Sequence, residues 1–467
     1  MKRTFIAAAL ALSVGAAFAN PDAVVIFFMF GAGGGGLSAA VTLHDLGREV
    51  VVLEKMPMIG GNTVRAEGGI NAAETPQQKK AGIPDTIDQF YADTMKGGHN
   101  LNDPALVRTL TTHAKDAVAW LVSLGADLNT VGRAGGAKYP RAHRPTDGSA
   151  IGPEVIRVLW KAAKDRKMDV RTQTRATEII MKDGRVAGVK ATTKDGKVYT
   201  IDAKAVVLAT GGFGANQDML VKYQPKLKGY ATTNQPGATG DGIILAEHAG
   251  AALVDMKQIQ AHPTAAPDGT LISESVRGDG GILINAEGKR FTNELLTRDV
   301  VSAAELKQPG RFAWVFWDDA TRKSAKLMDS YISMGLAVKG NTVAEIAKAM
   351  NVPAAELEAT LKAYAAGKAA GKDAFGRADM PQAMQTAPFF AVKVQPAVHH
   401  TMGGVKIDTK AEVLNPAGHT IPGLFAAGEV TGGVHGGNRL GGNAQADIVT
   451  FARIAGQSAD AYLKTAK

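Results

Sequence analysis

The first βαβ unit, residues 23–55, constrains the fold more than any other part of the sequence. It consists of an apolar run of strand length, a glycine-rich turn, a helix and a second strand that ends in an acid. Gly31, Gly33 and Gly36 supply a G-x-G-x-x-G motif, and Glu54 follows Gly31 by 23 residues. Such glycines let a pyrophosphate approach the helix N-terminus, and the acid accepts hydrogen bonds from ribose hydroxyls. The sequence therefore predicts a Rossmann-like α/β domain that binds a dinucleotide.

Further glycine-rich stretches favour a flavin dinucleotide over a nicotinamide. The stretch "GGNTVRAEGGINAA", residues 60–73, would suit a backbone wrapped around an isoalloxazine ring. "DAKAVVLATGGFGAN" places a buried strand before residues 210–212, and "IPGLFAAGEVTGG" leads to Gly428 and Glu429. A single nicotinamide rarely needs strand-then-glycine elements so far apart. An extended FAD does, because it touches strand ends drawn from distant parts of the chain.

The middle of the chain differs in character from these flavin-like segments. A length of 467 residues exceeds one ordinary core and predicts two or three domains. Residues 257–400 contain the alternating stretch "GGILINAEGKRFTNE" and then helical patterns. We interpret them as an inserted α+β capping domain that closes over the flavin. Its Ala- and Lys-rich helices are expected to have a solvated outer face and no catalytic part. Residues 20–256 and 401–467 then form the FAD-binding domain.

The N-terminal segment "MKRTFIAAALALSVGAAFAN" has a basic start, an apolar run and small residues at Ala17 and Ala19. This pattern is typical of a secretory signal peptide, which we assign to residues 1–19. No later segment has the roughly twenty apolar residues that a membrane span requires. We therefore expect a soluble, exported protein without a membrane span.

Composition excludes several kinds of chemistry. Cysteine is absent, so disulfides, iron–sulfur clusters and the attachment motif of a c-type haem cannot form. The spacing of the histidines does not favour a metal site. The formal net charge of +9 comes from basic residues scattered among acids, and we expect no nucleic-acid partner.

Polar residues gather in four short motifs in and around the insert, "QAHPT", "ISESVRG", "LTRDVV" and "VHHTMGG". Taken singly, each has a plain structural explanation, such as a surface ion pair between Arg298 and Asp299. Adjacent histidines cannot share one face of a strand, so at most one of the pair in "VHHTMGG" is expected to face a given ligand. The candidate functional residues in these motifs are His262, Ser273, Glu274, Arg277, Arg298, His399 and His400.

Taken together with Arg439, these residues indicate that a carboxylate-bearing substrate binds near the flavin. An arginine presents a fixed fork that matches two carboxylate oxygens, and a histidine adds a further donor. Arg439 stands in "GGVHGGNRLGGNA", a stretch with few side chains. Because glycine allows close approaches that a Cβ forbids, we expect this backbone to hold the guanidinium in a closed pocket beside the ring. A flexible surface loop is the alternative interpretation.

These motifs, with "RAHRPTDG", "TNQPGATGDG" and "VRGDGGILINAEGKRFTNE", resemble the flavin portion of the soluble periplasmic fumarate reductases of the flavocytochrome c type. The resemblance extends over nearly all of the chain from Asp22 onward. It implies non-covalent FAD, a periplasmic location and delivery of hydride from the reduced flavin N5 to an activated alkene. Because the chain shows no haem-binding N-terminal domain, we expect a separate electron donor, a small c-type cytochrome.

The resemblance also implies a role for each candidate residue. The family's catalytic acid corresponds to Arg298, with a proton path through Glu274 and Arg277. A guanidinium holds its proton tightly, so Arg298 would need immediate reloading through this path. The family's substrate-binding residues correspond to His262 and Ser273 at one end of the substrate, Glu274 beside them, and His399 and Arg439 at the other end.

The candidate FAD contacts come from the glycine-rich motifs and the residues beside them. They are Gly31, Ala32, Gly33, Gly36, Glu54, Lys55, Gly61, Asn62, Thr63, Gly68, Gly69, Asn71, Thr210, Gly211, Gly212, Asp241, Gly428, Glu429, Gly442 and Ala444.

Four residues depart from the family's pattern near the substrate. Ser273 replaces a threonine, which keeps the hydroxyl, while Arg133, Ala134 and Leu271 stand where apolar, often methionine, side chains are usual. These changes would allow another unsaturated acid, such as methacrylate, acrylate, urocanate or an aryl acrylate, in place of fumarate. A non-catalytic flavin carrier is the third hypothesis, and the intact proton path argues against it.

Overall fold

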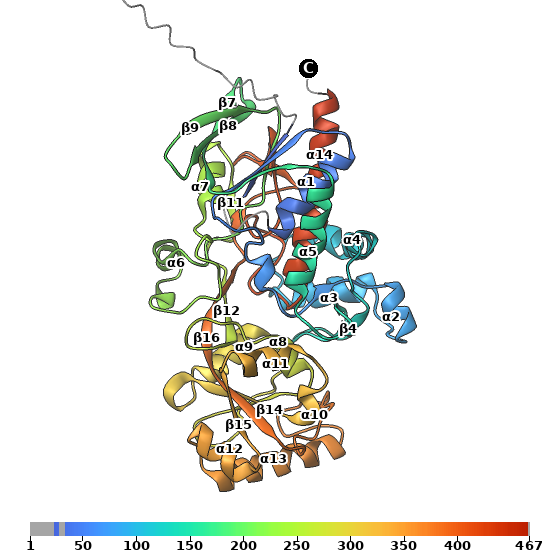
Figure 1. Ribbon diagram of the computed structural model, residues 1–467, viewed down its shortest axis with the longest axis vertical. Helices are drawn as coiled ribbons and strands as arrows, with labels where there is room; N and C mark the ends of the chain where they lie inside the picture. Colours follow the sequence, from blue (N-terminus) through green and yellow to red (C-terminus); the bar gives the residue numbers. More distant parts are fainter. Residues whose placement is uncertain (1–22, 28–32, 466–467) are drawn as a thin grey trace, which may run out of the picture.

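A six-stranded sheet forms the centre of the upper body in Figure 1. The computed structural model describes residues 23–27 and 33–465, so the predicted signal peptide, Gly31 and Ala32 lie outside the described residues. Neighbouring strands of this sheet pair in parallel, except for the antiparallel pair at one edge, Glu412–Leu414 with Thr420–Ala426. The order is β18 (Glu412–Leu414), β19 (Thr420–Ala426), β10 (Val206–Leu208), β1 (Ala23–Phe27), β2 (Val50–Glu54) and β6 (Asp169–Arg171). Strands from three distant parts of the chain therefore end side by side, as an α/β fold of this kind requires.

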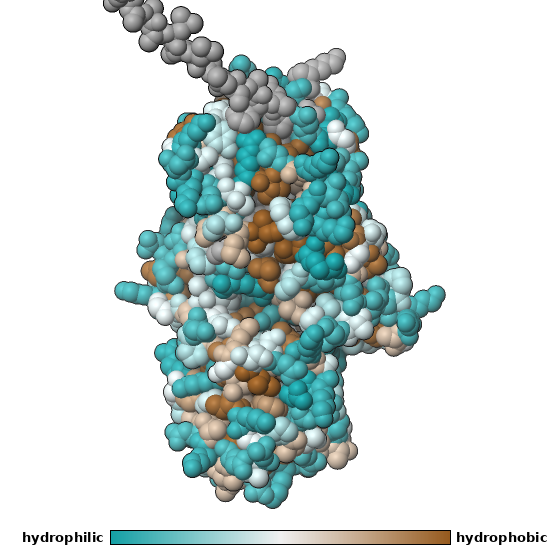
Figure 2. Space-filling model, in the orientation of Figure 1, coloured by the Kyte–Doolittle hydropathy of each residue, from teal (hydrophilic) through white to brown (hydrophobic). Residues whose placement is uncertain are grey.

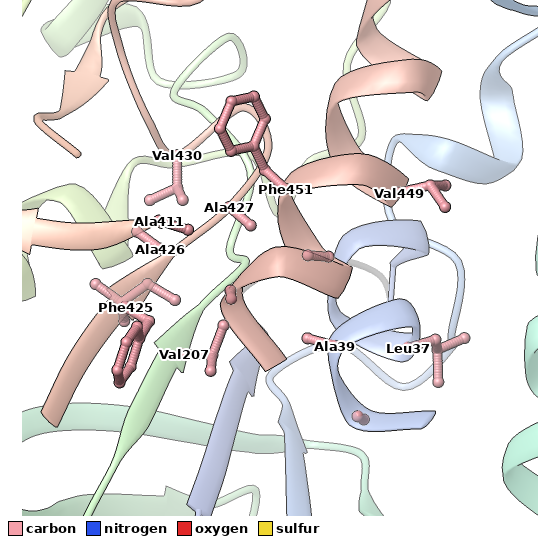
Figure 3. Close-up of a cluster of buried hydrophobic side chains, with 14 of the residues drawn as sticks. Leu37, Ala39, Val207, Ala411, Phe425, Ala426, Ala427, Val430, Val449 and Phe451 are labelled. Carbon is pink, nitrogen blue, oxygen red and sulfur yellow. The ribbon is translucent and has the colours of Figure 1, made fainter. Parts of the chain in front are cut away.

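Helix α1 (Gly34–Asp45) packs against the long C-terminal helix α14 (Asn443–Thr465). Small side chains bring the two backbones close, since a Cβ on Gly456 would lie 3.1 Å from the carbonyl oxygen of Ala39. Figure 3 shows Leu37 and Ala39 of α1 and Val449 and Phe451 of α14 in the buried cluster above the sheet. This packing places the glycine-rich segment before α14 next to the N-terminus of α1.

The remaining helices and small sheets of the upper body surround this core. Helix α4 (Pro104–Ser123) begins where Asp103 accepts hydrogen bonds from the first free amides and Pro104 occupies the first helical position. The other helices are α2 (Pro76–Lys80), α3 (Ile87–Gly97), α5 (Ile151–Asp165), α6 (Gln217–Tyr223) and α7 (Asp241–His248). The small sheets contain β3 (Ile70–Asn71), β4 (Thr130–Gly132), β5 (Ala142–Arg144), β7 (Thr174–Lys182), β8 (Arg185–Thr193), β9 (Val198–Asp202), β11 (Leu253–Val254) and β17 (Gly404–Val405).

The lower body in Figure 1 is built on an antiparallel sheet with its own two hydrophobic cores. Its strands are β12 (Ile259–Ala265), β16 (Phe389–Thr401), β14 (Ala313–Asp318), β13 (Ile282–Ile284) and β15 (Ala337–Gly340). The paired strands β12 and β16 run upward and connect the two bodies. Its helices are α8 (Glu274–Gly278), α9 (Arg298–Glu305), α10 (Asp319–Arg322), α11 (Leu327–Ser333), α12 (Val343–Met350) and α13 (Ala354–Ala369).

Helix α13 and the face drawn in Figure 2 show where hydrophilic side chains are exposed. Helix α13 buries only Leu357, Leu361 and Tyr364, as its Ala- and Lys-rich sequence predicts. Figure 2 shows hydrophilic side chains over most of one face, with hydrophobic ones gathered near its middle. Within residues 23–27 and 33–465, no helix is long and apolar enough to cross a bilayer.

Candidate active site

A cavity of about 1300 Å³, including its mouth, is lined by both bodies of the molecule. The wall combines the N-terminus of α1, the glycine-rich stretch before β3, strand β12, helices α8 and α9, and the segment that leads into α14. Segments that are far apart in sequence thus converge on one space.

The first half of the wall is almost free of side chains. Gly33, Gly34 and Gly35 open α1, whose first turn has no side-chain cap, so its amides are suited to a phosphate. Gly68 faces open space, because a Cβ built on it would meet no atom within 4 Å. A cradle of this kind fits an extended dinucleotide. Of the predicted FAD contacts, those that line the cavity are Gly33, Gly61, Asn62, Thr63, Gly68, Gly69, Gly211, Gly428, Glu429, Gly442 and Ala444.

The other predicted FAD contacts within the described residues do not line the cavity. Lys55 and Asp241 form an ion pair of 3.2 Å with each other. Asn71 donates hydrogen bonds to the carbonyl oxygen of Gly441 and to Asn443, which supports the bare backbone indirectly. The residues that do not line the cavity are Gly36, Glu54, Lys55, Asn71, Thr210, Gly212 and Asp241.

The second half of the wall carries charged side chains from the lower body. Helix α9 begins at Arg298, whose Nε and Nη2 donate to Glu274 Oε2 at 2.8 and 2.7 Å. Glu274 opens helix α8, and its Oε1 accepts from the Gly135 amide at 2.8 Å. Arg298 and Glu274 line the cavity, whereas Arg277 lies behind them with Nη1 donating to the carbonyl oxygen of Glu294. The predicted acid and Glu274 are therefore in direct contact, while Arg277 acts on Glu274 through its nearby charge and its Nε and Nη2 have no hydrogen-bond partner among the described residues.

Gln260 joins Arg298 to the main chain of Arg439 and was not identified from the sequence. Its Oε1 accepts from Arg298 Nη1 at 3.0 Å, and its Nε2 donates to the Arg439 carbonyl oxygen at 2.7 Å. A second hydrogen bond runs from Nε2 to Asn438 Oδ1 at 2.6 Å. The available signal was the strand alternation that places Gln260 and His262 on the same face.

The histidines supply neutral donors. The Thr264 amide donates to His262 Nδ1 at 3.2 Å, which leaves the proton on Nε2, an atom without a partner among the described groups. The His262 and His399 rings lie 4.9 Å apart, and His399 Nδ1 is hydrogen-bonded to Thr233 Oγ1. His400 also lines the cavity, but its ring lies edge-on to the His435 ring, with 5.2 Å between the ring centroids. The two adjacent histidines therefore have different neighbours.

Burial and mutual charge set the protonation states of these groups. Burial, together with the nearby Arg298 charge, lowers the pKa values of His262 and His399 well below their usual value, so both rings are neutral. Burial alone would raise the pKa of Glu274, but the charges of Arg298 and Arg277 outweigh it and keep the pKa below its usual value. Burial and repulsion from Arg298 lower the pKa of Arg439 to about 9. An uncompensated positive charge in such a space favours an anionic ligand.

Comparison with known proteins identifies this arrangement. Residues 22–444 match the family model described as an FAD binding domain. The chain is 49% identical to the fumarate reductase (cytochrome) of Shewanella frigidimarina over 95% of this chain and 78% of that protein. The chain belongs to the FAD-dependent fumarate reductase/succinate dehydrogenase family.

Two further matches are a solved structure and a longer relative. A solved structure, the open conformation of a flavocytochrome c3 fumarate reductase, has a TM-score of 0.77 at 46% identity and covers 95% of this chain and 78% of that one. The NADH:acrylate oxidoreductase of Vibrio harveyi is 37% identical over 94% of this chain and 50% of that longer protein. These matches confirm the predicted fold class, a Rossmann-like FAD-binding domain with an inserted α+β capping domain. The chain is an FAD-dependent oxidoreductase.

The unusual pocket residues Arg133, Ala134 and Leu271 all line the cavity. Arg133 Nη1 pairs with Asp379 at 2.8 Å, so its guanidinium is directed to the capping domain. Ala134 is small and lies beside Gly441. Together with Leu271, they line the same cavity as Arg298 and Arg439.

Proposed function

We propose that this protein is a periplasmic fumarate reductase that adds a hydride and a proton across the alkene of fumarate to give succinate. The observation that carries the proposal is that Arg298 and Arg439, 141 positions apart in sequence, line one cavity with two neutral histidines. FAD, bound without a covalent link, supplies the hydride when it is reduced. All other steps are assigned to side chains of the chain itself.

The substrate carboxylates would lie at opposite ends of the charged half of the cavity. Arg439 and His399 bind one carboxylate, and His262 Nε2 with the Ser273 hydroxyl binds the other. Hydrogen bonds to a carboxylate draw electrons from the alkene and make the far carbon electrophilic. Contacts that strengthen as charge develops lower the barrier.

Arg298 would deliver the proton to the second carbon of the alkene. Its contact with Glu274 at 2.7 Å would let the Glu274 carboxylate first take up a proton from the side of Arg277 and then pass it to Arg298. The alkene thereby gains one hydrogen on each carbon, and the electron pair comes with the hydride. The low pKa of Glu274 keeps it ionised between turnovers, ready to accept the next proton.

A second substrate class has a specific observation in its favour. The acrylate-reducing relative and the changes at Arg133, Ala134 and Leu271 support an unsaturated acid with one carboxylate, such as acrylate, methacrylate, urocanate or an aryl acrylate. The two carboxylate-binding ends proposed above favour the dicarboxylate. A non-catalytic electron carrier would have no need of the buried ion pair between Arg298 and Glu274.

The deciding experiment supplies electrons from reduced viologen dye and compares the turnover of fumarate, acrylate, methacrylate and urocanate. We expect fumarate to be reduced with the highest kcat/KM. A tenfold preference for a monocarboxylate, about 1.4 kcal/mol of transition-state discrimination, would overturn the substrate assignment. Lack of turnover with all four acids would favour the carrier.

The electron donor and location follow from the same proposal. The chain contains no cysteine for a haem attachment motif, so we assign delivery of electrons to a separate c-type cytochrome of the periplasm. Reduction of the holoenzyme by periplasmic c-type cytochromes, with dye-reduced enzyme as the reference, tests this assignment. A cytosolic location of the mature protein would contradict it.

A further inference from the structure

Glu67 lines the cavity and has no part in the mechanism above. It lies in the glycine-rich stretch of the FAD-binding domain, directly before Gly68. Tyr331 of helix α11, in the capping domain, donates a hydrogen bond from its hydroxyl to Glu67 Oε2 at 2.7 Å. The same hydroxyl accepts from the Ser273 amide at 2.9 Å. A chain of three residues thus crosses from one domain to the other and ends directly before Glu274.

This chain fixes a residue that the substrate is proposed to touch. Tyr331 and Ser273 are buried, so loss of either hydrogen bond would leave a polar group without a partner. The Ser273 hydroxyl is constrained as well, because it accepts from the Ser275 amide at 3.2 Å and caps helix α8. The main chain and side chain of Ser273 are therefore held by separate contacts, and the main-chain contact depends on Tyr331.

We propose that Glu67 and Tyr331 are positioning residues for Ser273, and that the charge on Glu67 decides how well this end of the cavity accepts a second carboxylate. The inference rests on the proposed function, because it assumes that Ser273 binds a substrate carboxylate. A neutral Glu67 leaves the hydroxyl and the His262 ring as donors. An ionised Glu67 adds a negative charge beside them, and like charges repel at short distance.

The charge on Glu67 changes within an accessible pH range. Burial raises its pKa to about 8, although the hydrogen bonds from Tyr331 and the Ser273 amide act in the opposite direction. The pKa of Tyr331 is raised well above its usual value, so the phenol stays neutral. The charged and titratable groups that share this cavity are Arg65, Arg133, Arg144, His262, Glu274, Arg298, His399, His400, Glu429 and Arg439.

Most of these groups keep one state between neutral and alkaline pH. His262, His399 and His400 are neutral throughout because their pKa values are well below the usual value, and Glu274 is ionised throughout. Arg439 has a pKa of about 9, but it is assigned to the carboxylate that fumarate and acrylate have in common. The ratio of the two affinities therefore cancels its titration, and the comparison with Glu67→Gln separates the titration of Glu67 from that of Glu429, whose pKa is also raised by burial.

The test measures the Kd values of fumarate and acrylate for the oxidised holoenzyme by the change in flavin absorbance. For the wild type, the ratio of fumarate Kd to acrylate Kd should rise about tenfold between about pH 7 and about pH 9. Glu67→Gln should abolish that rise. Tyr331→Phe should raise the fumarate Kd about fivefold at both pH values and leave the acrylate Kd unchanged.

Tyr364→Phe is the matched control, because this buried phenol of the same domain donates to the Gly280 carbonyl oxygen and does not line the cavity. It should change neither affinity. A ratio that does not change with pH, or that rises equally in Glu67→Gln, would overturn the inference, as would failure of either acid to bind. Turnover with reduced viologen dye is measured in parallel: its absence with both acids would contradict the proposed function, while the ratio still decides the role of Glu67.

Discussion

The two halves of the cavity solve the problem of ligand binding in different ways. The cofactor half presents backbone, with glycines at the start of α1 and before β3 and few side chains. The substrate half presents side chains, with Arg298, Glu274, His262 and Arg439 arriving from four separate segments. Backbone recognition depends on shape and on the space that a Cβ would fill. Side-chain recognition depends on charges that must be placed and paired by the whole fold.

The largest effect should come from the charged half. We predict that Arg298→Ala lowers kcat/KM for fumarate by about 10³-fold, because the proton donor is lost and Glu274 is left without its ion pair. Steady-state assays with reduced viologen dye measure this, and the flavin spectrum should show normal FAD content. Arg322→Ala is the control, since that arginine pairs with Asp319 and Asp329 near the surface. Turnover within a few-fold of wild type would remove Arg298 from the role of acid.

In the backbone half, the expected effect is on cofactor affinity. Gly68→Ala should weaken FAD binding by about ten- to a hundredfold, since its Cβ enters open cavity space. The thermal unfolding of the apoprotein should not change, because the Cβ meets no protein atom. Gly442→Ala should instead destabilise the apoprotein too, since Gly442 has a φ of 84° and its Cβ would lie 2.2 Å from Asn71 Oδ1. Equal FAD affinity in wild type and Gly68→Ala would contradict the assignment of Gly68 to the cofactor half of the cavity.

An intermediate effect should follow from Gln260, which belongs to the charged half but carries no charge. Gln260→Met keeps the length of the side chain and removes the acceptor for Arg298 Nη1. We expect kcat to fall about tenfold with FAD content unchanged. Gln308→Met is a suitable comparison, because Gln308 bonds Asn285 and Ala304 away from the cavity. A change confined to FAD binding would place Gln260 in the other half.

The smallest effect is expected at Ser273. Ser273→Thr retains both the hydroxyl and a residue type that caps helices well, so KM for fumarate should stay within about twofold. Initial rates across fumarate concentrations provide the measurement. An increase of tenfold or more would show that the extra methyl does not fit, and that the pocket is shaped for serine.

The sequence predicted the cofactor half more completely than the substrate half. The βαβ unit and the later glycine-rich stretches followed local rules, and the FAD cofactor, the enzyme class and the fold class are confirmed. Lys55 and Asp241 stay predictions as FAD contacts, and the ion pair between them could not be expected from residues 186 positions apart.

Gln260 and Glu67 show what sequence reasoning missed. Both lie in motifs that the sequence analysis used, but the functional roles in those motifs were assigned to other residues, His262 in the first and the glycines in the second. Their partners, Arg298 and Tyr331, lie in other parts of the chain. A role can be assigned to an uncharged amide, or to a carboxylate in a glycine-rich loop, only when its hydrogen-bond partner is known.

By itself, the sequence determined where the backbone must bend and where it must stay bare, because glycine freedom and strand or helix periodicity are properties of short segments. It also carried the motifs that assign the family. Only the tertiary structure decided which charges share one cavity, that His262 is a neutral donor and that Glu67 meets Tyr331 across two domains. The physical reason is that burial and Coulomb interactions depend on distances in space, which neighbours in sequence do not fix.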